Sequence, residues 1–329
     1  MNDALVNHRK SSVALLSVVS NSVLVGLKLV VGTLTGSVSI ISEAIHSGVD
    51  LLASVIAFMS VRTSGRPADD EHPFGHGKFE NLSGAAEAIL IFVAAAWIVS
   101  EAIHKLANPQ PLELLGWGVL IMLISSVANA VVSSRLMKVG RETDSIALRA
   151  DAWHLRTDVY TSAGVMVGLA VIWVCGRVFP NANLAWVDPV AAMLVAILIV
   201  KAAWDLTMES IRDLLDVRLA REEEAWIQDC VLGRRPVVIG MHGLRTRKAG
   251  SSHFIEFHMI LDKSMTVAEA HCISEDLEAA ISEHFAGSDV VIHVEPCDGS
   301  CKPRCVKGCL LSDQERKKLQ DSPRHGQPA

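Results

Sequence analysis

Two His/Asp pairs with the same spacing are the residues of this chain best placed for chemistry. The first is His46 and Asp50 in SEAIHSGVD, and the second is His154 and Asp158 in ADAWHLRTD. On a helix, residues four positions apart share a face, so each pair directs one imidazole and one carboxylate to the same side. Both pairs lie on or beside apolar stretches, where ionisable groups are costly and usually functional. Two such pairs facing each other would supply two nitrogen and two oxygen ligands, a set that suits tetrahedral Zn²⁺.

The overall composition is typical of a multi-pass membrane protein with a water-soluble appendage. Half of the 329 residues are hydrophobic, 20% are charged, and Tyr160 is the single tyrosine. This is too apolar for an ordinary soluble domain. The net charge of −6 argues against a nucleic-acid partner, because affinity for a phosphate backbone comes from Lys and Arg. No small-residue cleavage site follows the first apolar run, so we expect a retained helix there.

Six apolar segments predict a six-helix transmembrane unit. Each is near the ~20 residues that cross ~30 Å of hydrocarbon. They lie at about residues 12–33, 37–60, 82–105, 113–135, 150–176 and 186–207. The short loops after the second and fourth segments are rich in Lys and Arg, whereas the opposite loops carry almost none. The positive-inside rule therefore predicts that both termini are cytoplasmic.

Beyond Asp213 the pattern becomes that of a small α+β domain. The sequence predicts the order αββαβ. The elements are a helix, two strands, an amphipathic helix capped by Thr266, and a last strand, DVVIHVEP. This order favours a sheet with helices on one face. The tail is polar, as in disordered segments. We therefore expect an N-terminal segment, a transmembrane unit, this domain and a tail at residues 1–11, 12–212, 213–297 and 298–329.

Four stretches together resemble the cation diffusion facilitator family, and in particular its bacterial zinc and ferrous-iron efflux branch. They are SEAIHSGVDLLAS, RPADDEHPFGHGKFE, RADAWHLRTDVYTS, and HGLRTRKAGSSHFIEFH with VIHVEPC. The resemblance spans roughly residues 10–297. It implies a homodimeric metal/proton antiporter of the cell membrane rather than an enzyme. It also implies six transmembrane helices and a cytoplasmic metallochaperone-like domain, with divalent cations as substrate and regulatory ligands and no required cofactor.

The resemblance implies metal ligands in three places. The two His/Asp pairs match the transport site. The loop after the second segment holds the second set, which is Asp69, His72 and His76. The cytoplasmic domain holds the third set, which is His242, His258, His271, His293 and Glu295. By residue type Asp70 and Glu71 could replace Asp69. The usual carboxylate of the cytoplasmic set is Asp, which Glu295 replaces with a side chain one methylene longer.

The chemistry of the membrane pairs agrees with exchange of metal against protons. Two carboxylates neutralise one divalent cation in a low-dielectric setting, and without the cation protons must compensate them. Metal and protons then compete for the same side chains. The iron/zinc branch more often has Asp where this chain has His46. The imidazole favours Zn²⁺ over Mn²⁺ and Mg²⁺, whereas Fe²⁺, Cd²⁺ and Co²⁺ remain open alternatives.

Three other interpretations compete with this one. The pairs could be structural ion pairs with Arg149 or Arg156. An intramembrane metallohydrolase would also carry His and Asp on membrane helices, but it needs a motif such as H-E-x-x-H, which is absent from the sequence. A metal sensor without transport would fit the cytoplasmic domain and leave the membrane site idle.

Two further features allow more than one interpretation. The tail sequence CDGSCKPRCVKGC is either a thiolate site that captures metal or an unstructured segment with free thiols, and its residues are Cys297, Cys301, Cys305 and Cys309. Its Gly and Pro residues argue against a continuous helix. Lys78 and Asp216 are either the hinge pair that ties the halves of the dimer in this family, or two solvated charges.

Overall fold

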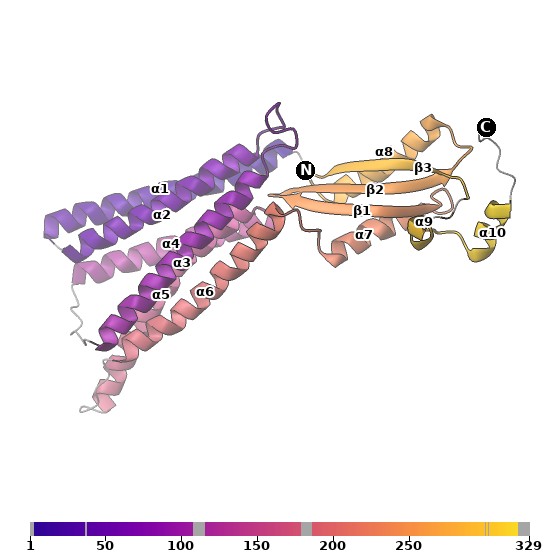
Figure 1. The fold of residues 1–329 in the computed structure, drawn as a ribbon. Coiled ribbons are helices and arrows are strands. Elements are labelled where there is room, and N and C mark those ends of the chain that lie inside the picture. Colours follow the sequence, from indigo (N-terminus) through magenta and orange to yellow (C-terminus); the bar gives the residue numbers. More distant parts are fainter. Residues whose placement is uncertain are drawn as a thin grey trace. The chain divides into compact units, whose positions relative to one another are not determined.

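The computed structural model describes residues 3–36, 38–107, 116–178, 186–299, 301 and 303–321 (Figure 1). The chain divides into two compact units, Met1–Leu214 and Leu215–Ala329. The predicted boundary between residues 212 and 213 falls in the last turn of the helix that ends the first unit.

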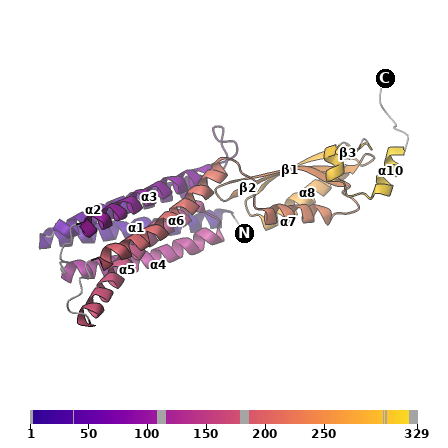
Figure 2. The same cartoon turned by 60° about the horizontal axis from the view of Figure 1, so that its bottom comes forward.

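The first unit is built, within the described residues, from six long helices. They are α1 (Asp3–Thr35), α2 (Val38–Ser64), α3 (Lys78–Ala107), α4 (Gly116–Glu142), α5 (Ile146–Val178) and α6 (Val187–Leu214). At 1.5 Å per residue, each is about 40–50 Å long, which exceeds the ~30 Å of hydrocarbon in a bilayer. The most extensive packing joins α1 with α2, α3 with α6, and α4 with α5 (Figures 1 and 2).

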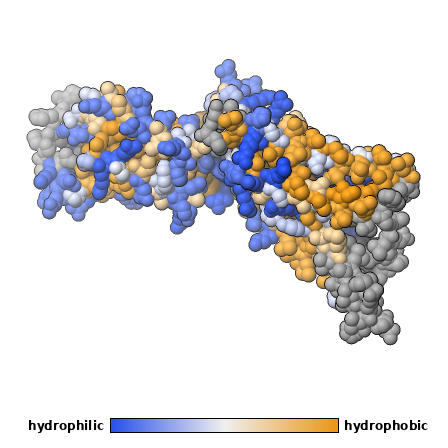
Figure 3. All heavy atoms as spheres, turned by 180° about the vertical axis from the view of Figure 1, so that it is seen from behind, coloured by the Kyte–Doolittle hydropathy of each residue, from blue (hydrophilic) through white to orange (hydrophobic). Residues whose placement is uncertain are grey.

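The surface of this unit is apolar over much of its length. Figure 3 shows hydrophobic residues over its helices, whereas the second unit is mostly hydrophilic in the same view. Among the described residues, five helices are long and apolar enough to cross a membrane, and they are α1, α2, α3, α4 and α6. The helix α5 is not among the five, and its first half carries two Arg, two Asp and a His. It packs against α4, α6 and α3 within the unit.

The expected N-terminal segment, residues 1–11, is helical from Asp3 onward as the first turns of α1. Lys10 is 1% exposed, and its Nζ lies 2.6 Å from Oε1 of Glu80 on α3. Because a buried Lys requires a partner, this ion pair fixes the start of α1 against α3.

The second unit has the order αββαβ followed by two short helices. Its elements are α7 (Arg221–Leu232), β1 (Gly240–Ala249), β2 (Ser252–Asp262), α8 (Val267–His284), β3 (Asp289–Cys297), α9 (Pro303–Lys307) and α10 (Asp313–Asp321). The strand order is β1-β2-β3. The pair β1 and β2 is antiparallel, and the pair β2 and β3 is parallel. The predicted fold class, a helical membrane unit with a small α+β domain, is confirmed.

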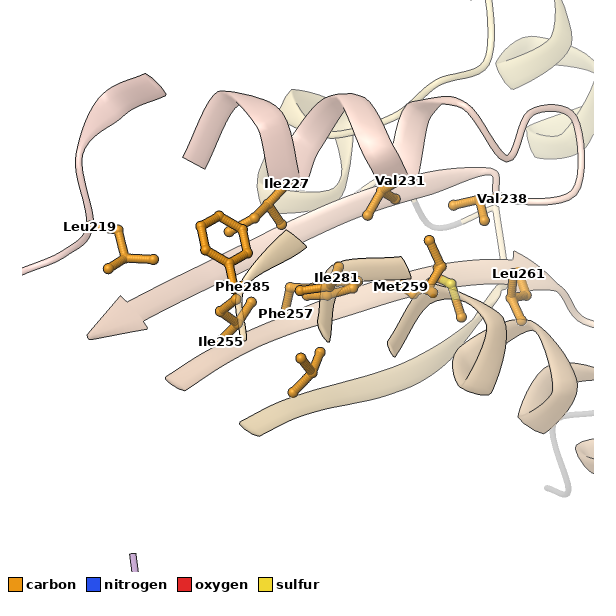
Figure 4. Close-up of a cluster of buried hydrophobic side chains, with 12 residues drawn as sticks. Leu219, Ile227, Val231, Val238, Ile255, Phe257, Met259, Leu261, Ile281 and Phe285 are labelled. Carbon is orange, nitrogen blue, oxygen red and sulfur yellow. The ribbon is translucent and has the colours of Figure 1, made fainter. Parts of the chain in front are cut away.

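Both main helices of this unit pack on one face of the sheet. Side chains alternate along a strand, so the odd-numbered residues of β2 share a face. Four of them are buried against side chains of α7 and α8 (Figure 4), and they are Ile255, Phe257, Met259 and Leu261. The even-numbered residues of β2, including His258, therefore lie on the opposite face of the sheet.

Residues 303–321 of the tail carry two short helices, whereas the sequence predicts disorder there. These helices are α9 and α10, and the tail pairs with the edge of β1. The N–H of Leu310 donates to the carbonyl of Ile239 at 2.8 Å. Such pairing gives the tail a place beside β1 without an apolar sequence, because backbone groups make the contacts.

Candidate metal sites

The two His/Asp pairs of the membrane unit meet by crossing between helices. His154 Nε2 on α5 lies 3.1 Å from Oδ1 of Asp50 on α2. His46 Nε2 on α2 lies 4.0 Å from Oδ1 of Asp158 on α5. Three of these residues offer ligand atoms that all lie within 4.8 Å of one another, and they are His46, Asp50 and Asp158. The fourth, His154, joins the group through Asp50, so all four predicted residues come together.

The burial of the site is uneven. The side chains of Asp50 and His154 are 6% and 7% exposed, whereas that of His46 is 55% exposed. Asn129 of α4 donates from Nδ2 to the Oδ2 of Asp158 at 3.2 Å. The site therefore has a shielded side at Asp50 and His154, and an open side at His46.

A polar network extends from the shielded side. Asn21 of α1 donates to the hydroxyl of Ser54 at 2.6 Å. The same hydroxyl lies 3.1 Å from the backbone carbonyl of Asp50 and 3.1 Å from Oδ1 of Asp151. Asp151 is completely buried, and its Oδ2 has no hydrogen-bond partner among the described residues. A buried, half-satisfied carboxyl group that is linked through Ser54 to the backbone of Asp50 is a position where a proton can be held.

The arginines do not make the ion pairs that a purely structural role would require. Arg149 pairs with Glu209 on α6 and lies 3.8 Å from Asp144. The guanidinium of Arg156 lies 5.5 Å from the ring centre of Trp153. Within the described residues, neither arginine pairs with the four site residues, so this alternative lacks its expected contacts.

Two buried lysines of α1 were missed by the sequence reasoning. Lys28 is 3% exposed, and its Nζ donates to Ser47 at 2.7 Å and to Glu43 at 3.2 Å. Glu43 lies one turn before His46 on α2. Lys10 is the second. The available signal was a lone lysine inside an apolar run, VLVGLKLVVG, since such a charge must find a partner inside the protein.

The loop between α2 and α3 forms a second cluster. Ligand atoms of Asp69, His72 and His76 lie within 4.8 Å of one another. Asp69 Oδ1 is 3.5 Å from His72 Nδ1, and Oδ2 is 3.3 Å from His76 Nε2. Gly75 turns the chain between the two histidines with φ of 78°. The structure thus gathers all three predicted residues and leaves Asp70 and Glu71 outside the cluster.

The backbone of this loop holds the Asp69 carboxylate in its ionised form. The N–H groups of His72 and Glu71 donate to Oδ1 at 2.8 and 3.1 Å. The His72 N–H is the main cause that lowers the pKa of Asp69, and the nearby imidazoles lower it further. The carboxylate is therefore an anionic ligand at neutral pH.

Strand register builds the third cluster on the open face of the sheet. His242 of β1 is paired with His258 of β2, and His258 is paired with His293 of β3. The ring centres of adjacent members lie 5.0 and 4.8 Å apart. Glu295, two residues after His293 on β3, shares its face. Three residues form a compact set within 4.8 Å, and they are His242, His258 and Glu295.

Glu295 is the centre of this cluster. Its carboxylate lies 2.7 Å from His258 Nδ1, 3.6 Å from His242 Nε2 and 3.8 Å from His293 Nε2. The hydrogen bond with His258 is the main cause that lowers the pKa of Glu295. Although Glu is longer than the Asp that the family resemblance implies, its carboxylate reaches all three imidazoles.

One predicted ligand lies outside this cluster. His271 is on α8, which covers the opposite face of the sheet from His258, and its Nε2 pairs with Glu275 at 3.3 Å. The predicted grouping of His271 with the other histidines is therefore not what the structure shows. His253 of β2 is buried, with its ring centre 5.3 Å from that of Phe285.

The proposed hinge residues lie in different units. Lys78 begins α3, and Asp216 follows α6 with a positive φ of 54°. Asp216 Oδ1 lies 3.4 Å from Arg247 Nη1 of β1. The hinge pair stays a prediction.

Comparison with known proteins places the chain in a family. A family model described as the cation efflux transmembrane domain matches residues 14–215. A second, described as the cytoplasmic domain of cation efflux proteins, matches residues 219–297. An uncharacterised transporter of Synechocystis sp. is 38% identical over 285 residues, which cover 87% of this chain and 90% of that protein.

Named relatives are similar over most of their length. The cation-efflux pump FieF of Citrobacter koseri is 36% identical over 304 residues, which cover 92% of this chain and 97% of the pump. The metal-bound C-terminal domain of the CzcD transporter from Thermotoga maritima is a solved structure with 32% identity, which covers 24% of this chain and 94% of that domain with a TM-score of 0.22. The chain therefore belongs to the cation diffusion facilitator family and is a multi-pass cation efflux transporter of the cell membrane.

Proposed function

We propose that the protein moves Zn²⁺ out of the cytoplasm in exchange for protons, as a homodimer whose termini are both cytoplasmic. The observation that carries this proposal is the crossed pairing of His46 with Asp158 and of His154 with Asp50. Ligand atoms of His46, Asp50 and Asp158 lie within 4.8 Å of one another, and His154 contacts Asp50, so α2 and α5 contribute two imidazoles and two carboxylates to one cluster. This is a ligand set for tetrahedral Zn²⁺, with no ligand position left for a reactive water.

Exchange follows from the charges of these four groups. With Zn²⁺ bound, the two carboxylates neutralise the ion. Without it, Asp50 and Asp158 leave two negative charges in a partly buried setting, which protons on the site must compensate. An imidazole that is to bind metal has to give up its proton, so metal and protons exclude each other. Protons that enter from outside would therefore displace the metal outward.

The two other clusters suit capture and regulation on the cytoplasmic side. The loop cluster has three ligands, so a fourth position stays open for exchange. The cluster on the sheet would hold a metal that binds only one arrangement of the dimer and shifts the equilibrium toward it. A cytoplasmic rise in zinc would then favour transport.

Vesicle flux tests the transport proposal. The purified protein is reconstituted in sealed vesicles with a zinc dye inside, and uptake of Zn²⁺, Fe²⁺, Co²⁺, Cd²⁺ and Mn²⁺ is followed. We expect Zn²⁺ uptake that is lost in Asp50→Ala and in His154→Ala. Asp205→Ala, which removes an exposed carboxylate of α6, is the control that keeps it. A folded protein that binds zinc but carries no metal would instead be a sensor.

A further inference from the structure

Four cysteines line one cavity of the second unit. The cavity has a volume of about 780 Å³. It is bordered on one side by part of the histidine cluster, and on the other by Cys297, Cys301, Cys305 and Cys309. All four cysteines are free thiols. The tail thus brings sulfur ligands to the face of the sheet that already carries His242, His258 and Glu295.

The backbone fixes the tail in this place. The N–H of Met241 on β1 donates to the carbonyl of Gly308 at 2.9 Å, and the tail continues in register with Leu310 bonded to Ile239. A Cβ atom at Gly308 would lie 1.6 Å from the carbonyl oxygen of Met241. Glycine is therefore required at this crossing. The short helix α9 and the Gly308 crossing together carry Cys305 and Cys309 to the cavity.

We propose that Cys297, Cys301, Cys305 and Cys309 form a four-thiolate site for a soft divalent cation, Zn²⁺ or Cd²⁺. Four thiolates are a common tetrahedral set for Zn²⁺. The site is distinct from the imidazole and carboxylate cluster beside it, and it does not depend on transport. Among the described residues, the sulfurs are less tightly gathered than the three clusters above. Tetrahedral Zn–S bonds of about 2.3 Å put sulfurs about 3.8 Å apart, so the tail closes on the ion when it binds.

Alkylation of the wild-type protein tests this site without any substitution. The full-length, reduced protein is treated with iodoacetamide with and without Zn²⁺, and each cysteine is followed by mass spectrometry. At about ten times the dissociation constant, zinc protects the four tail cysteines about tenfold. Cys272, which is exposed on α8, keeps its reactivity as the internal control. Equal labelling of the tail with and without zinc would overturn the proposal.

Cobalt spectroscopy identifies the ligands. Co²⁺ bound by thiolates gives a sulfur-to-metal charge-transfer band in the near ultraviolet, which imidazole and carboxylate ligands do not give. We expect this band in the wild type and in a His242→Ala/His258→Ala variant, because the sulfur site is separate. A variant with Cys301, Cys305 and Cys309 changed to Ser loses it, whereas Cys230→Ser/Cys272→Ser keeps it.

A backbone variant tests the geometry with every ligand left in place. Gly308→Ala lifts the tail from β1 and weakens Co²⁺ binding by the thiols. Gly233→Ala is the matched control, since its Cβ would meet neighbouring atoms only at 3.5 Å, an ordinary contact, and its φ is helical. Retention of the band in the triple cysteine variant, or equal affinity in Gly308→Ala and wild type, would contradict the site.

Discussion

Asp158→Asn tests the charge balance of the membrane site most sharply. The amide keeps the shape of the side chain but removes one of two negative charges. Ligand atoms of Asp158, Asp50 and His46 lie within 4.8 Å of one another. At that separation and an effective dielectric of about 20, two unit charges interact by about 3.5 kcal/mol. The substitution removes the attraction of the cation to this carboxylate, which is at least about 3.5 kcal/mol because an ion between the ligands lies closer than 4.8 Å, whereas the repulsion between Asp50 and Asp158 is present with and without the ion and cancels from the binding free energy.

A loss of at least about 3.5 kcal/mol corresponds to zinc binding that is weaker by roughly 300-fold or more. The assay is the zinc concentration that gives half-maximal uptake in vesicles, because this reads the transport site rather than the cytoplasmic clusters. Asp205→Asn makes the same chemical change at an exposed position of α6 and serves as the control. If the half-maximal zinc concentration of Asp158→Asn stays within about threefold of the wild-type value, the expected 300-fold effect is absent and the charge-balance reasoning is wrong.

Three further predictions follow from the same contacts. His46→Asp replaces an imidazole by a harder ligand, so the Zn²⁺ to Mn²⁺ ratio of initial uptake rates falls about tenfold or more; an unchanged ratio refutes the role of His46. Thr266→Ala removes the cap of α8, where Oγ1 accepts from the Glu269 N–H at 3.3 Å. The loss of about 1 kcal/mol speeds hydrogen exchange of the first α8 amides about fivefold, and equal exchange would count against the cap. Contact with His258 lowers the pKa of Glu295, so its stabilisation is present above the usual Glu pKa of ~4.3 and is lost as pH falls through the lowered value. In the metal-free protein, Glu295→Gln therefore reduces the fall of the unfolding temperature as the pH becomes acidic. An identical fall in the variant and the wild type would contradict this.

The membrane ligands could be predicted because their information is local. The spacing of four residues fixes His46 and Asp50 on one helical face, and the same holds for His154 and Asp158. The crossed partners could not be predicted, since they depend on how α2 packs against α5. The same limit explains Lys28: its position in an apolar run requires a partner, but only the packing of α1 on α2 identifies Ser47 and Glu43.

The cytoplasmic cluster shows where strand patterns are sufficient and where they are not. Alternation along β3 puts His293 and Glu295 on one face, as predicted. The alignment of His242 with His258 depends on the register of β1, which shifts between His242 and Arg245. His271 was grouped with them on the family resemblance, and the sequence carries no information about which face of the sheet α8 covers. The pairing of the tail with β1 could not be predicted, because it depends on backbone contacts and on Gly308.

The direction of zinc movement under an imposed pH gradient tests the central proposal most directly. Vesicles that hold the wild-type protein are loaded with a zinc dye, and the gradient is set acidic inside, acidic outside or absent. An antiporter moves zinc toward the acidic side, so reversal of the gradient reverses the flux and a protonophore abolishes accumulation. Zinc flux of the same size and direction under all three conditions would contradict proton exchange at His46, Asp50, His154 and Asp158.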